Sequence, residues 1–209
     1  MSRILGASCR LCRREGIKLM LKGNRCETAK CAMEKQWRSH PPGMHGAASR
    51  KSSPFGVRLR EKQKVKRYYG VLERQFRCYY AEAQRSTGNT GEALLSLLER
   101  RLDNVLCKAG FAASRKGARE SIVHGHFTLN GRRVDRPSIM ISIGDRIGVK
   151  GKERTEKMVR AVMETRNITV QPWLNVDPQK LEITVAALPS REDVQIPVEE
   201  NLIVEFCSR

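Results

Sequence analysis

The stretch that decides the fold reads LLSLLERRLDNVLCKAGFAASRKGARESIVHGHFTLNGRRVDRP at residues 94–137 and SIMISIGDRIGV at residues 138–149. Apolar residues first recur at helical spacing, from Leu94 to Ala109. Gly110 follows, and glycine commonly ends a helix because its backbone tolerates positive φ. The first part of the stretch therefore predicts a helix that ends at this glycine.

A second helix is predicted directly afterwards. Ser114 offers an N-cap hydroxyl, the helix runs over about 115–124, and Gly125 ends it. The period then drops towards two at Phe127–Leu129, which leads into Asn130–Gly131. This dipeptide favours a type I′ hairpin turn because both residues accept positive φ. A helix pair is thus joined to a hairpin.

Antiparallel strands continue the pattern. Arg132–Val134 returns from the turn, and the alternating Ile139–Ile143 segment predicts a further strand. Gly144–Asp145 then turns the chain into Arg146–Lys150, a last strand of this unit. We therefore predict helices packed on a small antiparallel sheet.

The polar side of this unit is basic. A compact basic face with few acids suits a phosphate backbone, whereas the alternative interpretation is a helix pair and hairpin whose charges are only solvated. The candidate RNA-binding residues here are Arg100, Arg101, Arg115, Lys116, Arg119, Arg132, Arg133 and Arg136.

Several short motifs in this stretch are shared with a known module. RLDNVLCKAGF, ARESIVHGHFTLNG, the VDRPS turn and the GD before the last strand resemble the RNA-binding module named after small-subunit ribosomal protein S4. That module also occurs in rRNA-modifying enzymes, a heat-shock RNA-binding protein and a tRNA synthetase. The rest of the chain must therefore decide between these functions.

Length and charge limit the possible domain count and the possible partners. The chain has 209 residues, enough for one or two domains, and a formal net charge of +18. Residues 1–92 carry +14, residues 93–150 carry +6 and residues 151–209 carry −2. The strong positive charge of residues 1–150 favours a polyanionic partner, and nucleic acid fits better than a membrane surface. No apolar run is long enough to span a bilayer and no secretion signal opens the chain, so we expect an unexported, cytoplasmic protein.

Four cysteines near the start have the spacing of a metal knuckle, C-x2-C-x13-C-x4-C, and are Cys9, Cys12, Cys26 and Cys31. Four thiolates leave no open coordination position, so a structural Zn²⁺ is expected rather than a catalytic one. An iron–sulfur cluster would use the same ligands; free thiols and two disulfides are the other interpretations. The knuckle would display the candidate RNA-binding residues Arg13, Arg14, Lys18, Lys22 and Arg25.

Residues 35–56 are rich in Pro, Gly, Ser and basic residues, which predicts an extended arm. From Val57 the period is helical, and Gly70 divides the run in two. The first helix is densely basic with only Glu61 opposed, which favours a phosphate-facing surface. The candidate residues of the arm and helix are Arg50, Lys51, Arg58, Arg60, Lys62, Lys64, Lys66 and Arg67.

The remaining part of the chain is close to neutral. A helix is predicted over about 153–167 and a strand over Leu181–Val185. The last apolar residues, around Leu202–Phe206, fit a short helix or a strand equally well. This acid-balanced tail favours contact with protein over contact with phosphate.

Taken along its whole length, the chain resembles the bacterial small-subunit ribosomal protein S4 family. The motifs that carry the resemblance follow one another in order: CRLCRREG, LKGNRC, PPGMHG, LREKQKVKRYYGVLERQFRCYY, the central module and the terminal LIVEFCSR. The resemblance implies an α+β protein: a four-cysteine metal knuckle and basic arm at 1–45, and an all-helical domain at 46–92 completed by about 187–209. A sheet-containing domain at 93–186 would be inserted between them, with the RNA-binding module at about 99–162.

The resemblance also implies a role. Family members bind a multi-helix junction in the 5′ region of 16S rRNA and nucleate assembly of the body of the small subunit. They contact ribosomal protein S5 and other small-subunit proteins, contribute to translational accuracy, and line the mRNA entry path, where Arg50 and Lys51 are candidate contacts. No enzymatic activity, small-molecule substrate or membrane is implied.

Two other classes of protein remain alternatives. A pseudouridine synthase carries the same module, but only 59 residues follow Lys150, too few for its catalytic domain. A zinc-knuckle DNA-binding regulator would place a recognition helix in the major groove. The basic face predicted here spans a helix and a hairpin, which suits irregular RNA better.

Overall fold

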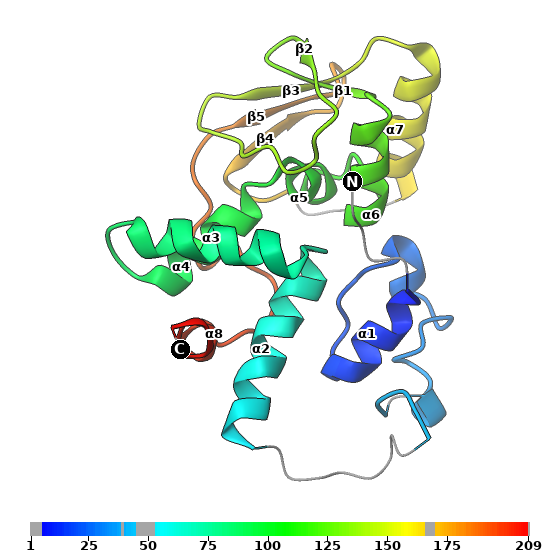
Figure 1. Cartoon of the computed structure of the whole chain (residues 1–209). Helices are drawn as coiled ribbons and strands as arrows, with labels where there is room; N and C mark the ends of the chain where they lie inside the picture. Colours follow the sequence, from blue (N-terminus) through cyan, green and yellow to red (C-terminus); the bar gives the residue numbers. More distant parts are fainter. Residues whose placement is uncertain (1–5, 39, 45–52, 166–169, 209) are drawn as a thin grey trace. The chain divides into compact units, whose positions relative to one another are not determined.

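The computed structural model describes residues 6–38, 40–44, 53–165 and 170–208 (Figure 1). The chain forms two compact units, one from residues 1–94 with 195–209 and the other from residues 95–194. The first unit thus contains both ends of the chain, and the second is inserted between them.

The first unit is helical among its described residues. Its elements are α1 (Ser8–Glu15), the 3-10 turns η1 (Gly23–Cys26) and η2 (Gln36–Arg38), α2 (Pro54–Tyr68), α3 (Glu73–Arg85), the start of α4 (Thr90–Glu99) and α8 (Glu200–Cys207). The Ser53 hydroxyl caps α2 by accepting from the Gly56 amide at 3.2 Å. Gly70 has a φ of 64° between α2 and α3, so the predicted division of this basic run is confirmed.

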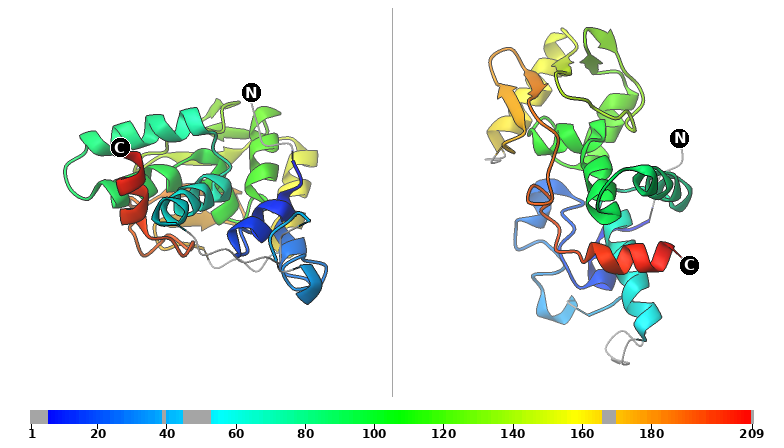
Figure 2. Two further views of the ribbon diagram at one scale, coloured as in Figure 1. Left: turned by 60° about the horizontal axis from the view of Figure 1, so that its bottom comes forward. Right: turned by 90° about the vertical axis from the view of Figure 1, so that its left-hand side faces the viewer.

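The end of the chain packs back on the first unit. Helix α8 crosses α2 (Figures 1 and 2), and the rings of Phe55 and Phe206 lie 5.3 Å apart. Ile203 of α8 and Val65 of α2 are fully buried. The segment whose sequence fitted either a helix or a strand is therefore a helix, and its apolar face is buried by packing that the local sequence cannot report.

Asn89 caps the start of helix α4 with its side chain. The Asn89 carboxamide oxygen accepts from the Gly91 amide at 2.9 Å, and its nitrogen donates to Glu92 at 3.2 Å. The single helix predicted from Leu94 to Ala109 is wrong, because α4 ends at Glu99 and α5 (Leu102–Lys108) starts a new helix.

The break between α4 and α5 has a physical cause. Arg101 is extended and forms an isolated bridge with Met140. The Leu102 amide donates to the Ile139 carbonyl, and the Ile141 amide donates to the Arg100 carbonyl, both at 3.0 Å. These long-range bonds replace the helical ones, and a helical period alone does not reveal them.

The second helix and the hairpin form as predicted. Ser114 caps α6 (Arg115–Val123) by accepting from the Gly117 amide at 3.2 Å. β1 (Phe127–Leu129) and β2 (Arg132–Arg133) are joined by Asn130–Gly131, whose φ values are 49° and 79°. The type I′ prediction is thereby confirmed.

Within the described residues the second unit contains a five-stranded antiparallel sheet in the order β2-β1-β3-β5-β4. The other strands are β3 (Arg146–Val149), β4 (Leu174–Asp177) and β5 (Glu182–Val185). The strand predicted at Ile139–Ile143 is wrong: its backbone bonds go to Arg100 and Leu102, and Ile143 is exposed.

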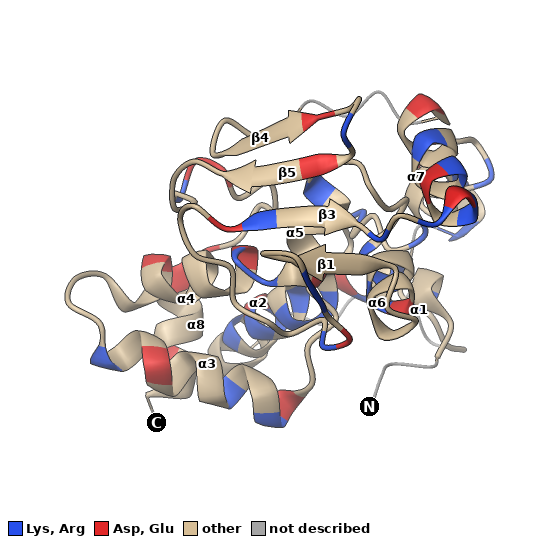
Figure 3. Cartoon of the chain, turned by 90° about the horizontal axis from the view of Figure 1, so that it is seen from above, with Lys and Arg blue, Asp and Glu red and all other residues tan. Residues whose placement is uncertain are grey.

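Helices cover one face of this sheet. Helices α5 and α6 lie against it (Figures 1 and 3), and their apolar residues share one buried core with the strands. Val159 of α7 (Glu153–Thr165), a helix predicted from the sequence, joins the same core, as does Trp173 before β4. The mixed helix and antiparallel-sheet class is thus confirmed. No helix within the described ranges combines the length and apolarity needed to cross a membrane.

Candidate RNA-binding surface and cysteine cluster

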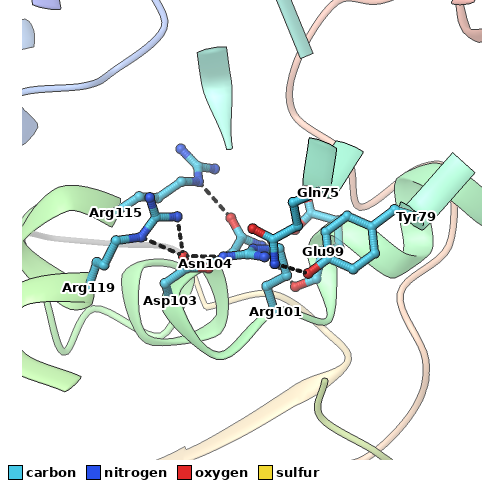
Figure 4. Close-up of polar contacts among 8 residues, drawn as sticks. All are labelled: Gln75, Tyr79, Glu99, Arg101, Asp103, Asn104, Arg115 and Arg119. Carbon is cyan, nitrogen blue, oxygen red and sulfur yellow. Dashed lines mark hydrogen bonds and ion pairs between the residues drawn. The ribbon is translucent and has the colours of Figure 1, made fainter. Parts of the chain in front are cut away.

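A buried network of charged residues organises the second unit (Figure 4). Asp103 and Arg101 are each only 1% exposed, and Arg101 binds both carboxylate oxygens, with Nε at 3.1 Å and Nη2 at 2.8 Å. Arg119 of α6 reaches the same carboxylate, with Nε at 3.1 Å. One carboxylate on α5 therefore receives two guanidinium groups, which is how a buried charge is stabilised.

A second part of the network lies one residue further along α5. The side-chain nitrogen of Asn104 donates to the backbone carbonyl and to the carboxylate of Glu99. The side-chain oxygen of Asn104 accepts from Arg115 Nε at 2.7 Å. Lys108 pairs with Glu99 at 3.2 Å and donates to the Asp193 carbonyl at 2.6 Å. Burial lowers the pKa of Lys108, although the Glu99 charge opposes that shift. This network fixes α6 against α5.

The network changes how four candidate residues are interpreted. Arg101 and Arg115 are buried, and Arg119 is held by Asp103. Arg100 donates from Nε to the Ile141 carbonyl at 2.9 Å. These side chains have internal partners that position α6 and the segment before β3. Their assignment to a phosphate-binding face stays a prediction.

The remaining candidates of the second unit point outward. Lys116 on α6 is exposed, as are Arg132, Arg133 and Arg136 on and after β2. Among the described residues, these three arginines make no ion pair. Figure 3 shows where lysine and arginine lie on the strands and helices of this unit. The hairpin and the outer side of α6 thus carry the candidate cations that solvent, and hence phosphate, can reach.

The six cations of α2 are all paired inside the first unit. The sequence interpretation that only Glu61 opposes them is wrong, because acids from distant segments reach this helix. Arg60 and Arg67 bind Glu15, Lys62 and Lys66 bind Glu73, Lys64 binds Glu61 and Arg58 binds Glu205. Ion pairs therefore connect helix α2 to α1, α3 and α8.

Two of these acids have shifted pKa values. Burial opposes ionisation of Glu73, but hydrogen bonds from Lys62 and Lys66 outweigh it and lower the pKa of Glu73 to about 2. Burial raises the pKa of Glu15, and the positive charges of Arg67 and Arg60 act in the opposite direction. Glu73 is thus held in its charged form by the two lysines.

The four cysteines surround one place. Cys9 and Cys12 lie on α1 and Cys26 ends η1, and these three line one small cavity together with Cys31. The Lys22 amide donates to Cys26 Sγ at 3.4 Å. Burial raises the pKa of Cys12 and of Cys26, and neighbouring cysteines raise both further.

The donor chemistry of the cavity fits a thiolate-binding metal, since sulfur is the ligand that zinc and iron–sulfur clusters share. The positions of the side chains do not match this donor chemistry. In the part of the chain that the structure describes, no three His, Cys, Asp or Glu side chains form a group that could hold a metal ion as they stand.

The candidate basic residues between Cys12 and Cys26 divide into paired and exposed ones. Lys18 pairs with Glu34, and Arg13 Nε donates to the His40 carbonyl at 3.0 Å. Arg14, Lys22 and Arg25 are exposed. The two arm candidates, Arg50 and Lys51, lie outside the described residues.

Sequence reasoning missed the acids and the amide that organise the site. Glu99, Asp103 and Asn104 sit inside a basic stretch and are almost fully buried. A usable signal was present, because an acid and an amide on the apolar side of a short helix require internal partners. That signal indicates that some of the nearby basic residues are buried as partners of these groups.

Comparison with known proteins adds an independent finding. Residues 3–99 match the family described as Ribosomal protein S4/S9 N-terminal domain, and residues 100–147 match the S4 domain. The chain is 53% identical to small ribosomal subunit protein uS4A of Alkaliphilus metalliredigens and 51% identical to uS4 of Desulfitobacterium hafniense. It is 56% identical to uS4 of Acidothermus cellulolyticus, and each alignment covers 100% of both chains.

Proposed function

Because this chain belongs to the small ribosomal subunit protein uS4 family, we propose that it is a structural, non-enzymatic constituent of the small ribosomal subunit and works by binding rRNA. The relatives that support this carry that subunit in their names and align over their full length. The proposed location is accordingly the ribosome.

The observation that carries the proposal is the separation of cations into two classes within the S4 domain. Arg101, Arg115 and Arg119 are tied into the buried network, while Lys116 faces outward on α6 and Arg132, Arg133 and Arg136 face outward on and after β2. Phosphate contacts do not read base sequence. A rigid arrangement of cations selects RNA by the shape of its backbone.

We propose that the RNA is a multi-helix junction in the 5′ region of 16S rRNA, as the family resemblance implies. A protein that binds the folded junction better than its open forms shifts the equilibrium towards the folded form. Binding would in this way nucleate assembly of the body of the subunit. Arg14, Lys22 and Arg25 extend the proposed contact to the first unit.

The test removes three exposed cations, K116Q/R132Q/R136Q, and measures rRNA affinity across salt concentrations. The slope of log K against log salt is negative, and each lost phosphate contact makes it shallower by about 0.9. We therefore expect the slope of the variant to be shallower by about 2 to 3. A matched variant, K157Q/R160Q/K180Q, removes the same charge elsewhere in the second unit and should keep the wild-type slope. Equal slopes in both variants and wild type would overturn this surface.

We also propose that Cys9, Cys12, Cys26 and Cys31 hold one structural Zn²⁺, with an iron–sulfur cluster as the alternative. The support is the donor set: four sulfurs line one cavity of a short segment with a small core. When bound, the metal would replace the thiol protons and cross-link α1 to the segment around Cys26 and Cys31. That cross-link would hold Arg14, Lys22 and Arg25 in place for RNA.

Metal content decides this second proposal. Elemental analysis of the purified protein should give one zinc per chain, and Cys26→Ser should lower that ratio. The matched control Cys78→Ser changes an exposed cysteine outside the cavity and should leave the ratio unchanged. A colourless wild-type protein with no zinc and no iron would contradict it.

The resemblance further implies partners among ribosomal proteins. We propose that ribosomal protein S5 and other small-subunit proteins contact this chain, with consequences for translational accuracy, and that the arm reaches the mRNA entry path. Support comes from the family alone. Mixing labelled S5 with the protein bound to rRNA tests the first contact directly, and no binding at micromolar concentration would contradict it.

A further inference from the structure

A second group of cations gathers at another place in the second unit, around the His124-Gly125-His126 turn between α6 and β1. Burial lowers the pKa of His126, and the positive charges of His124, Lys152, Arg154 and Lys150 lower it further. Side chains from the end of α6, the end of β3 and the start of α7 therefore lie close enough to His126 to oppose protonation of its imidazole.

The chain brings these groups together through specific contacts. The Lys150 amide donates to the His126 carbonyl at 2.8 Å, and His126 Nδ1 lies 3.2 Å from the Thr155 hydroxyl in the first turn of α7. The rings of His124 and His126 lie 6.1 Å apart. The turn is thus anchored to both the sheet and the helix, and it is a fixed structure rather than a loose run of charge.

Arg133 joins the group from the hairpin. Its guanidinium covers Gly125 so closely that a methyl group on this glycine would collide with it. Gly125 also has a φ of 71°, which places glycine here for two reasons: backbone conformation and close approach. The arginine thereby links this group to the outward-facing cations of β2.

No ion pair joins an acid to Lys150, Lys152, Arg154 or Arg133 among the described residues. The first turn of α7 carries two acids, Glu153 and Glu156, and Glu153 pairs with Lys157. Figure 3 shows lysine and arginine where the chain leaves β3 and enters α7. Gathering like charges costs free energy in the isolated protein, and an anion placed among them would recover it.

We propose that His124, Arg133, Lys150, Lys152 and Arg154 form a second phosphate-binding site, which holds the RNA backbone at the α6–β1 turn. The inference rests on the proposed function, because it assigns further residues to the same rRNA. These residues lie outside the candidate surface read from the sequence, apart from Arg133, which is common to both. The ligand is an RNA phosphodiester, contacted by side chains that come from four separate elements.

The test compares two variants that each lose two charges from exposed or half-exposed positions of the second unit. K150Q/K152Q removes cations from the proposed site, while R160Q/K180Q removes cations from the region where Arg160 meets the β4–β5 turn. Both full-length proteins are titrated with a 5′ fragment of 16S rRNA at several salt concentrations. Emission of the buried Trp173 checks that each variant is folded.

We expect K150Q/K152Q to lower the slope of log K against log salt by about 1.8 and affinity near 0.1 M salt by at least about tenfold. R160Q/K180Q should match the wild type. Equal losses in both variants would overturn the site and leave only general electrostatic attraction. If the wild type prefers the rRNA fragment over unrelated RNA and K150Q/K152Q binds the fragment as tightly as the wild type, this inference alone is overturned. If the wild type shows no preference for the rRNA fragment over unrelated RNA, the proposed function is overturned too.

Discussion

Replacing Asp103 with alanine tests the buried network that positions α6. Asp103 is 1% exposed and accepts hydrogen bonds from Arg101 and Arg119, and Arg101 is equally buried. Removing one partner of a buried ion pair typically costs about 3–5 kcal/mol, because the other charge stays buried without compensation. This is a large share of the about 5–15 kcal/mol that stabilises a typical domain.

The two tryptophans make the assay specific to one unit. Trp173 in the second unit is 3% exposed, whereas Trp37 in the first unit is 63% exposed. The red shift of emission on urea unfolding therefore reports mainly the second unit. With a urea dependence of about 2 kcal/mol per molar, Asp103→Ala should lower the midpoint of this transition by about 1.5–2.5 M.

The matched control is Asp135→Ala, which removes an exposed acid from the same unit and should change the free energy of unfolding by less than about 0.5 kcal/mol. If Asp103→Ala cost no more than Asp135→Ala, the network would not stabilise the unit. The explanation given for the buried arginines would then be refuted.

Three further predictions concern single contacts. Ser114→Ala removes the N-cap of α6 and should cost about 1 kcal/mol, seen as a midpoint lower by about 0.5 M in the Trp173 assay; no shift would contradict the cap. Ile203→Ala opens the buried contact of α8 and should destabilise the first unit by about 2–5 kcal/mol, measured by circular dichroism; a cost under about 1 kcal/mol would contradict the packing. The lowered pKa of Glu73 means that its ion pairs with Lys62 and Lys66 stabilise the first unit above about pH 4.3 and that this contribution is lost as pH falls towards 2. Glu73→Gln should therefore be less stable than wild type at pH 6 and by a much smaller margin near pH 2, and a difference that does not change with pH would exclude the linkage.

The sequence predicted local structure well wherever the determinant is local. The Ser114 cap, the Asn130–Gly131 turn and the division at Gly70 depend on residues a few positions apart, and all three formed as predicted. The break before Leu102 depends on a bridge to Met140, 39 positions away from Arg101. Periodicity contains no information about such a partner.

The candidate site shows the same division. Composition identified a basic protein and its motifs identified the module, but neither could sort the arginines by burial. Arg115 and Lys116 are neighbours in sequence, yet the first bonds to Asn104 inside the unit and the second is exposed. On α2 the missing information was that Glu15 and Glu73 come from other segments to neutralise the helix.

The most direct test of the central claim is a competition experiment with the purified full-length protein. The 5′ region of 16S rRNA competes against unrelated RNA of equal length and against duplex DNA at several salt concentrations. Shape recognition by positioned cations predicts a preference for the rRNA that persists as salt is raised and general attraction is screened. Equal affinity for all three nucleic acids, lost together at high salt, would contradict it.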